Sequence, residues 1–310
     1  MKLVAAFFKM IRWPNLIFIA LTQFLFYFCV FEKLLTEPGD HHKDVVFYLL
    51  VLVSVLIAAA GYIINDYFDL QIDAINKPQK IVVDKIVKRR WAIMWHWILS
   101  GIGIVLSFYI SYKIDNWIIG IANIGCVLLL WFYSTTFKKK ILSGNIIISA
   151  LTAWVIVVVY FFCGANIRVW QQQDISFDAQ RFFKFTLLYA GFAFITSIIR
   201  EVIKDLEDME GDARYKCRTM PVVWGVRTSK VFIAVWLVVC IAALAIVQLY
   251  TGQLGWWPIS VYTVFCIIVP LIFIFRNLYK AVSPVDYHKL STAIKFVMLA
   301  GILSMLFFIF

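Results

Sequence analysis

The chain has 310 residues, of which 63% are hydrophobic and only 15% are charged, with a formal net charge of +11 at pH 7. Soluble domains average about 45–50% apolar and about 25% charged residues, so this composition excludes an ordinary soluble protein and predicts an integral membrane protein. The positive charge requires no nucleic-acid partner, because basic residues gathered on one side of a membrane set its topology and attract anionic lipids.

Nine apolar runs, each long enough to cross a bilayer, follow one another along the chain. They cover residues 15–32, 45–64, 92–112, 117–136, 145–164, 181–200, 229–250, 256–275 and 291–310. An interfacial segment over residues 1–14 precedes them, and residues 74–91 form a basic loop too polar to cross. We therefore expect an all-α fold, a multi-span transmembrane bundle of about nine helices that forms one membrane domain over residues 1–310.

Lysine and arginine residues are divided unequally between the two sides of the predicted bundle. With a cytoplasmic N-terminus, the cytoplasmic segments carry 23 of the 29 Lys and Arg residues. This bias predicts a multi-pass protein of the cell inner membrane, with the N-terminus and the polar loops after the second and sixth spans in the cytoplasm.

The second expected span ends in the acidic stretch NDYFDLQID, residues 65–73. Asp66, Asp69 and Asp73 are spaced at i, i+3 and i+7, so on a helix their carboxylates project from one face. Such close like charges repel one another unless a cation lies among them. Oxygen ligands without His or Cys favour Mg²⁺, which keeps several waters and bridges to substrate phosphates.

The same spacing recurs in DLEDMEGD, at Asp205, Asp208 and Asp212. Each of these lies 139 residues after its counterpart in the first motif, and Lys216 follows Lys77 at the same offset. The offset spans four expected helices, an even number, so the repeat is parallel and both motifs would face the same compartment. The sequence therefore predicts two pseudo-repeated halves, each with an Asp-rich motif.

Two opposed motifs of this kind could hold two or more divalent ions with a diphosphate between them. The ions would neutralise a leaving diphosphate and let a carbon–oxygen bond ionise. We expect all six aspartates to be metal ligands, and Asp66, Asp69, Asp205 and Asp208 to be catalytic. The candidates for binding the diphosphate are Asn65, Lys77, Lys80, Lys139, Arg200, Lys204, Lys216 and Arg218.

A diphosphate bound at the membrane surface suggests that its other end is lipidic. Apolar and aromatic helices would hold an isoprenoid tail and protect an allylic cation from water. Glu201 adds a carboxylate one turn before Asp205. Its role is left open, because it could instead pair with Arg200, Lys204 or Lys216.

The stretches NDYFDLQIDAINKP and DLEDMEGD, on a bundle of about nine helices, resemble the UbiA superfamily of intramembrane prenyltransferases. Its two signatures, NDxxDxxxD and DxxDxxxD, are both intact, and the likeness extends to YSTTFKKKILSGN and GDARYKCRTMPVVWG. The resemblance implies Mg²⁺-dependent transfer of a prenyl group from a prenyl diphosphate to a lipophilic acceptor. One departure is that Lys80, followed by Ile81, replaces an Arg-Pro-type pair of many members, which offers phosphate a point charge instead of a fork.

The flank REVIKDLEDMEGD is similar to the branch that makes archaeal-type ether lipids, the geranylgeranylglyceryl-phosphate geranylgeranyltransferases. That likeness implies a prenylglyceryl phosphate as acceptor. The branch that prenylates aromatic quinone precursors shares both metal motifs and remains an alternative. A cation transporter is the alternative of another class, but it predicts acidic residues near mid-membrane in several spans, whereas here they cluster at one rim.

Overall fold

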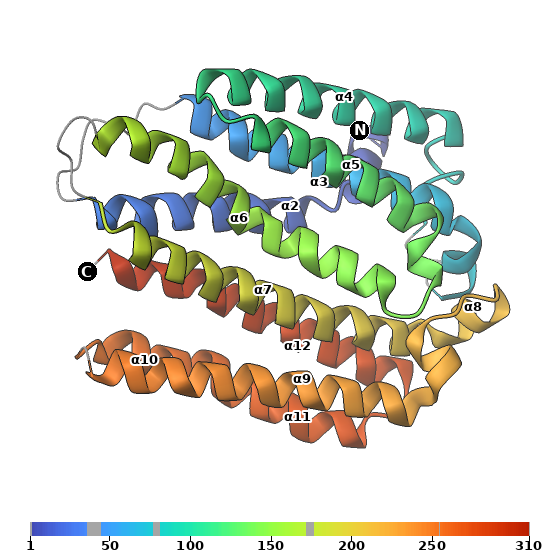
Figure 1. The fold of residues 1–310 in the computed structure, drawn as a ribbon. Coiled ribbons are helices and arrows are strands. Elements are labelled where there is room, and N and C mark those ends of the chain that lie inside the picture. Colours follow the sequence, from blue (N-terminus) through green and yellow to red (C-terminus); the bar gives the residue numbers. More distant parts are fainter. Residues whose placement is uncertain (1, 36–44, 77–80, 172–176, 254, 310) are drawn as a thin grey trace. The chain divides into compact units, whose positions relative to one another are not determined.

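The chain is almost entirely helical wherever the computed structural model describes it, which is over residues 2–35, 45–76, 81–171, 177–253 and 255–309. The α-helices in Figure 1 are α1 (Lys2–Met10), α2 (Trp13–Leu25), α3 (Val45–Asn76), α4 (Arg89–Lys113), α5 (Trp117–Thr135), α6 (Ser143–Gln171), α7 (Ala179–Glu207), α8 (Met209–Arg214), α9 (Met220–Gln253), α10 (Trp257–Thr263), α11 (Val269–Lys280) and α12 (Pro284–Leu303). Short π- or 3₁₀-helical segments are η1 (Phe26–Phe31), η2 (Glu32–Leu34), η4 (Phe137–Lys139), η5 (Val264–Ile268) and η6 (Ser304–Phe308). Within these ranges there is no β-strand, only two isolated bridges, so the predicted all-α class is confirmed.

Nine stretches in the described part of the chain are long and apolar enough to cross a membrane. They are Trp13–Leu34, Val45–Asn76, Arg89–Lys113, Trp117–Thr135, Ser143–Gly164, Ala179–Glu207, Met220–Gln253, Trp257–Lys280 and Pro284–Phe308. Each overlaps one of the predicted runs, which confirms the predicted spans. Several extend further than predicted, because polar residues at a membrane surface need not end a helix. Helix α3, with 32 residues, is about 48 Å long, well beyond the roughly 30 Å of hydrocarbon.

The chain divides into two compact units, and each carries one acidic motif. Unit 1 comprises residues 1–137 and 154–187, and unit 2 comprises residues 138–153 and 188–310. The first motif belongs to unit 1 and the second to unit 2, in agreement with two motif-bearing halves. The single domain expected over residues 1–310 and the expected opposition of the two motifs stay predictions.

Helix α3 is the central helix of unit 1 and packs against α2, α4 and α5. Gly61 lets α3 approach α5, since a Cβ at this position would lie 2.9 Å from the Cδ atoms of Leu130. Gly103 of α4 lies equally close to α3, where a Cβ would lie 3.0 Å from Cγ1 of Ile57. Small residues at such crossings allow the close backbone approach by which helices associate in lipid. This packing fixes the direction of α3 and therefore of the motif at its end.

Unit 2 has a buried apolar cluster formed by α7, α9, α11 and α12, with Leu206, Leu237, Leu271 and Ile294 among its members. Helix α9 is interrupted at Gly225, whose φ of 82° and ψ of 164° are accessible to glycine at little cost. Leu206 directly follows Asp205, so the cluster anchors the end of α7 that carries the second motif.

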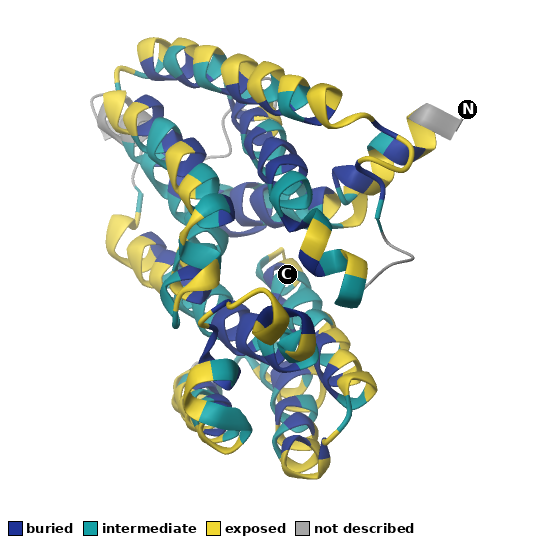
Figure 2. Ribbon diagram, turned by 90° about the vertical axis from the view of Figure 1, so that its right-hand side faces the viewer, coloured by how far each residue is buried: buried dark blue, intermediate teal, exposed yellow. Residues whose placement is uncertain are grey.

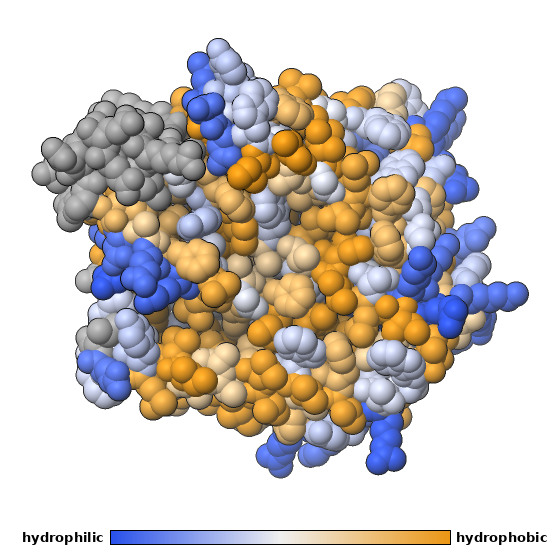
Figure 3. Space-filling view, in the orientation of Figure 1, coloured by the Kyte–Doolittle hydropathy of each residue, from blue (hydrophilic) through white to orange (hydrophobic). Residues whose placement is uncertain are grey.

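Large apolar side chains remain exposed along the spanning helices, among them Val105, Ile121, Leu249 and Phe265. Exposed residues form stripes along individual helices in Figure 2, and hydrophobic residues cover most of the face seen in Figure 3. A surface of this kind in water would drive association, whereas lipid tails are as apolar as the side chains and solvate them. The composition, the helices and this surface together identify an integral membrane protein.

Candidate active site

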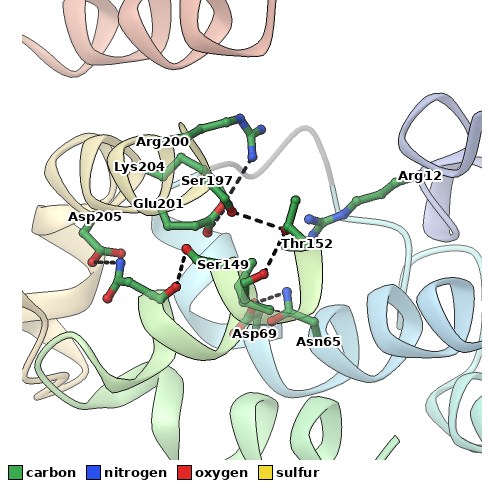
Figure 4. A network of polar contacts seen from close by, with 12 residues as sticks. Arg12, Asn65, Asp69, Ser149, Thr152, Ser197, Arg200, Glu201, Lys204 and Asp205 are labelled. Atoms are coloured by element: carbon green, nitrogen blue, oxygen red, sulfur yellow. Dashed lines mark hydrogen bonds and ion pairs between the residues drawn. The ribbon is translucent and has the colours of Figure 1, made fainter. Parts of the chain in front are cut away.

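The first motif lies on the last turns of α3, which remains helical from Val45 to Asn76. Its three carboxylates therefore share one helix face, as the spacing predicts. Asn65 Nδ2 donates a hydrogen bond to Asp69 Oδ2 at 2.7 Å (Figure 4). Asp69 is buried, with 3% of its surface exposed, so this amide orients a carboxylate that water barely reaches.

Arg12 is a contact of the first motif that the sequence did not identify. It lies between α1 and α2 in the left-handed conformation, with φ 52° and ψ 52°. Its Nη2 donates to Asp66 Oδ1 at 2.6 Å, and its guanidinium lies 5.2 Å from the ring centroid of Tyr62. Burial opposes the charge of Arg12, but Asp66, Tyr62 and Asp69 together outweigh this effect and raise the pKa of Arg12 above its ordinary value. The first motif thus has a permanent cation beside it.

The second motif is not carried by one continuous helix. Asp205 belongs to α7, Asp208 forms the boundary with φ −96° and ψ 5°, and Asp212 lies on the short helix α8. The break is small, because Asp208 N still donates to Lys204 O at 2.9 Å and Asp212 N to Asp208 O at 3.2 Å. Aspartate competes with helical backbone bonding and is common at such boundaries. The spacing suggests that all three carboxylates lie on one continuous helix, and for the second motif this is wrong.

Asp205 and Asp212 of the second motif both make hydrogen bonds with other parts of unit 2. Asn145 of α6, itself buried, donates from Nδ2 to Asp205 Oδ2 at 2.8 Å. Asp212 is buried, and its backbone oxygen accepts from Cys217 N at 2.9 Å. Asn145 is the last residue of the stretch YSTTFKKKILSGN, and its 60-residue separation from Asp205 gives no sign of this contact in the sequence.

Glu201 pairs with two of the cations predicted to bind a diphosphate. Lys204 Nζ donates to both carboxylate oxygens, at 3.1 and 2.9 Å, and Arg200 Nη1 donates to Oε1 at 3.1 Å (Figure 4). Glu201 is 8% exposed, whereas the side chains of Arg200 and Lys204 keep 26% and 28% of their surface accessible. Of the three partners that the sequence left open, Glu201 contacts Arg200 and Lys204.

The remaining predicted cations are exposed or lie outside the described residues. Lys139, Lys216 and Arg218 have exposed side chains. A backbone hydrogen bond from Arg218 N to Lys139 O, 2.8 Å long, joins the loop after α8 to the η4 segment. Lys77 and Lys80 lie outside the part of the chain that the structure describes.

The donor set can be tested for its fit to Mg²⁺. Among the described residues, no three His, Cys, Asp or Glu side chains gather closely enough to form a protein-only metal site. Magnesium seldom uses such a cage, because it keeps waters and binds through one or two carboxylates together with substrate phosphates. Six aspartates without His or Cys ligands, three in each motif, suit that mode of binding. The role of each aspartate stays a prediction.

Comparison with known proteins relates the chain to a family of prenyltransferases. A family model described as the UbiA prenyltransferase family matches residues 13–307. The digeranylgeranylglyceryl phosphate synthase of Methanosphaera stadtmanae is 30% identical over 263 residues, which cover 83% of this chain and 86% of that protein. A solved digeranylgeranylglyceryl phosphate synthase structure has a TM-score of 0.63 at 24% identity and covers 99% of both chains.

A UbiA homolog from Archaeoglobus fulgidus, solved with DMAPP and Mg²⁺ bound, has a TM-score of 0.59 at 15% identity. The match covers 96% of this chain and 98% of that one. At these identities the two solved structures demonstrate a shared fold.

Proposed function

Since the chain belongs to the UbiA prenyltransferase family, we propose that it moves a prenyl group from a prenyl diphosphate to the free hydroxyl of a prenylglyceryl phosphate. The observation that carries the proposal is the pair of intact acidic motifs, each at the end of a spanning helix and each with cations close by. The acceptor is supported by the similarity to the Methanosphaera stadtmanae protein, which is named a digeranylgeranylglyceryl phosphate synthase. Family membership sets aside the cation transporter.

The first motif, at the end of α3, would bind the diphosphate of the donor. Asp66, Asp69 and Asp73 would hold Mg²⁺ together with the diphosphate oxygens, with Asn65 keeping Asp69 in place. Asp205, Asp208 and Asp212 would do the same from the second motif. Bound Mg²⁺ supplies the charge that neutralises the departing diphosphate.

The cations of unit 2 would bind the diphosphate directly. Arg200 and Lys204, held by Glu201, would donate hydrogen bonds to its oxygens. The bond from prenyl C1 to the diphosphate oxygen breaks, and its electron pair leaves with the diphosphate. The acceptor hydroxyl oxygen then forms the new carbon–oxygen bond and releases its proton. Apolar helices would keep water from the allylic cation.

The orientation is part of the proposal. We place the N-terminus and both acidic motifs on the cytoplasmic side of the cell inner membrane. This placement is supported by the 23 of 29 Lys and Arg residues that fall in segments on that side.

A product assay tests the proposal. Purified protein in detergent with Mg²⁺ and labelled geranylgeranyl diphosphate is offered a prenylglyceryl phosphate, 4-hydroxybenzoate or a naphthoate. We expect ether-lipid product only, and loss of turnover in Asp66→Ala and Asp208→Ala. A prenylated aromatic product would replace the acceptor and keep the reaction. No transfer to any acceptor would refute the proposed function.

A further inference from the structure

Helices α11 and α12 of unit 2 pack against each other, and a groove of about 480 Å³ lies along them. Its polar lining residues are Asn277, Lys280, Asp286 and Lys289. None of the six aspartates of the acidic motifs lines it, and neither does any cation proposed to bind the diphosphate. The groove is therefore not part of the proposed active site.

Polar and apolar residues occupy different ends of this groove. Lys280 is the last residue of α11, and Lys289 lies in the second turn of α12. The apolar lining residue Phe273 precedes Lys280 by seven residues, or about 10 Å at about 1.5 Å per residue. Ala293 lies one turn beyond Lys289, further into the span Pro284–Phe308. The groove is thus cationic at the turn between the two helices and apolar toward the interior of the membrane.

The cationic end carries two lysines and one carboxylate. The side chains of Lys280 and Lys289 are exposed, and within the described part of the chain neither forms an ion pair or a hydrogen bond. The carboxylate of Asp286 caps α12, where its Oδ2 accepts from Ser283 N at 3.0 Å and from Ser283 Oγ at 2.8 Å. This end of the groove therefore has a net positive charge and two ammonium groups that can bind an anion.

The apolar part has a buried floor and an exposed edge. Ile274, Ala281 and Leu290 line the groove and are only 3%, 3% and 6% exposed, whereas Phe273 is 58% exposed. A groove of this kind on a spanning helix is open to lipid tails, which are as apolar as its lining. Lysines at such a position lay their methylene stems along the apolar surface and keep their ammonium groups in the polar interface.

The cationic end of the groove lies at the same end of unit 2 as the second acidic motif. His288 Nδ1 lies 3.0 Å from Oε1 of Glu207, the residue before Asp208. Lys230 Nζ donates to the backbone oxygen of Ala281 in the turn at 2.6 Å. With the motifs on the cytoplasmic side, both lysines face the cytoplasmic leaflet, whose anionic lipids attract basic residues.

We propose that the groove between α11 and α12 is a binding site for an anionic phospholipid. The lipid phosphate lies between Lys280 and Lys289, which donate charge-assisted hydrogen bonds to it. One acyl chain follows the apolar floor past Ile274. A zwitterionic lipid also carries a phosphate, but its cationic choline group opposes the two lysines. A free phosphate compound has no chain to cover the floor.

Native mass spectrometry of the full-length protein in detergent tests the site. The probes are phosphatidylglycerol, phosphatidylcholine with the same chains, and glycerol 3-phosphate. We expect phosphatidylglycerol to bind roughly tenfold more tightly than phosphatidylcholine, and glycerol 3-phosphate not to be retained. Lys280→Ala/Lys289→Ala should bring phosphatidylglycerol down to the affinity of phosphatidylcholine. Lys88→Ala/Arg90→Ala removes two exposed cations of unit 1, is matched in net charge, and should keep the native preference.

Equal affinity for the two lipids in the native protein would overturn the proposal, and this result needs no variant. A preference for phosphatidylglycerol that survives Lys280→Ala/Lys289→Ala would overturn it too. An equal loss in the control pair would attribute the preference to net charge and would also contradict the site. Binding of glycerol 3-phosphate as tight as that of the lipid would replace the lipid by a free phosphate. None of these measurements depends on prenyl transfer, so the site and the proposed function can fail separately.

Discussion

The two acidic motifs share one spacing but are built differently. The first lies on one uninterrupted helix, with Asn65 of the same helix bonded to Asp69 and Arg12 paired with Asp66. The second crosses the boundary between α7 and α8, and its amide partner, Asn145, comes from another helix. A repeated sequence pattern thus specifies which ligands are present and leaves each half free to support them in its own way.

This difference suggests a division of labour between the units. In unit 1, α3 is packed closely against α4 and α5, which suits a fixed anchor for metal and phosphate. In unit 2, Glu201 holds two long cationic side chains that remain partly accessible, which suits direct recognition of the diphosphate. The following substitutions test whether unit 1 mainly anchors metal and phosphate while unit 2 mainly recognises the diphosphate.

The largest effect is expected from removing one buried or hydrogen-bonded carboxylate in each motif. Asp69→Asn and Asp205→Asn should each lower kcat by at least about 10³-fold, or about 4 kcal/mol of transition-state stabilisation, because each would lose a negative charge at a position proposed to bind Mg²⁺. Single-turnover assays at saturating Mg²⁺ measure the loss. Asp115→Asn, at an exposed left-handed position outside both motifs, is the control and should be as active as the native protein.

A near-native rate in only one of the two variants would contradict the expectation that both motifs are required for the reaction. It would mean that a single motif supports ionisation of the donor, with the other acting in binding alone.

Glu201→Gln should act on binding of the donor. Without the carboxylate, Arg200 and Lys204 lose the partner that orients them, and we expect the donor KM to rise roughly 10- to 100-fold while kcat changes less than about threefold. Glu201→Asp should recover part of the loss, since it keeps the charge. A fall in KM would contradict this role and would mean that Glu201 restrains the cations' attraction for phosphate.

The matched control for Glu201 is Glu210, which pairs with Arg214 at 2.7 Å on α8 with both side chains exposed. Exposed ion pairs contribute little to stability, so Glu210→Gln should leave both kcat and the donor KM unchanged. A comparable rise in KM for both variants would attribute the effect to net charge near the second motif.

The amide partners offer the most direct comparison of the two halves. Asn145→Ala should raise the Mg²⁺ concentration for half-maximal activity about tenfold, because partners that orient metal ligands influence affinity by about 10- to 100-fold. Asn65→Ala should have a smaller effect, since Asp69 is already fixed by its place on a packed helix. Titration of activity with Mg²⁺ measures both, with the exposed Asn277→Ala as control. The reverse order would contradict the view of α3 as the more rigid anchor.

The spans were predictable because they depend on local hydrophobicity, and a bilayer admits few other structures for such runs. The ends of the helices were less predictable, because α3 continues to Asn76 and α7 to Glu207 through polar sequence. The contacts of Arg12 with Asp66 and of Asn145 with Asp205 join positions 54 and 60 residues apart. Those pairings are set by the left-handed turn at Arg12 and by helix packing, which spacing alone does not encode.

The smallest effect is expected at the exposed cations of unit 2. Lys139→Ala and Arg218→Ala should each raise the donor KM about two- to threefold at low salt, and the difference should vanish near 0.5 M NaCl, because exposed charges are weak and well screened. The Glu201→Gln effect should persist at that salt, since a buried pair is screened far less. The hydrogen bond between Arg218 and Lys139 joins backbone atoms, so we expect both variants to keep the loop geometry. A salt-independent loss of 100-fold in either variant would place that cation in the site beside Arg200 and Lys204, and would extend the cationic role of unit 2 beyond the pair that Glu201 holds.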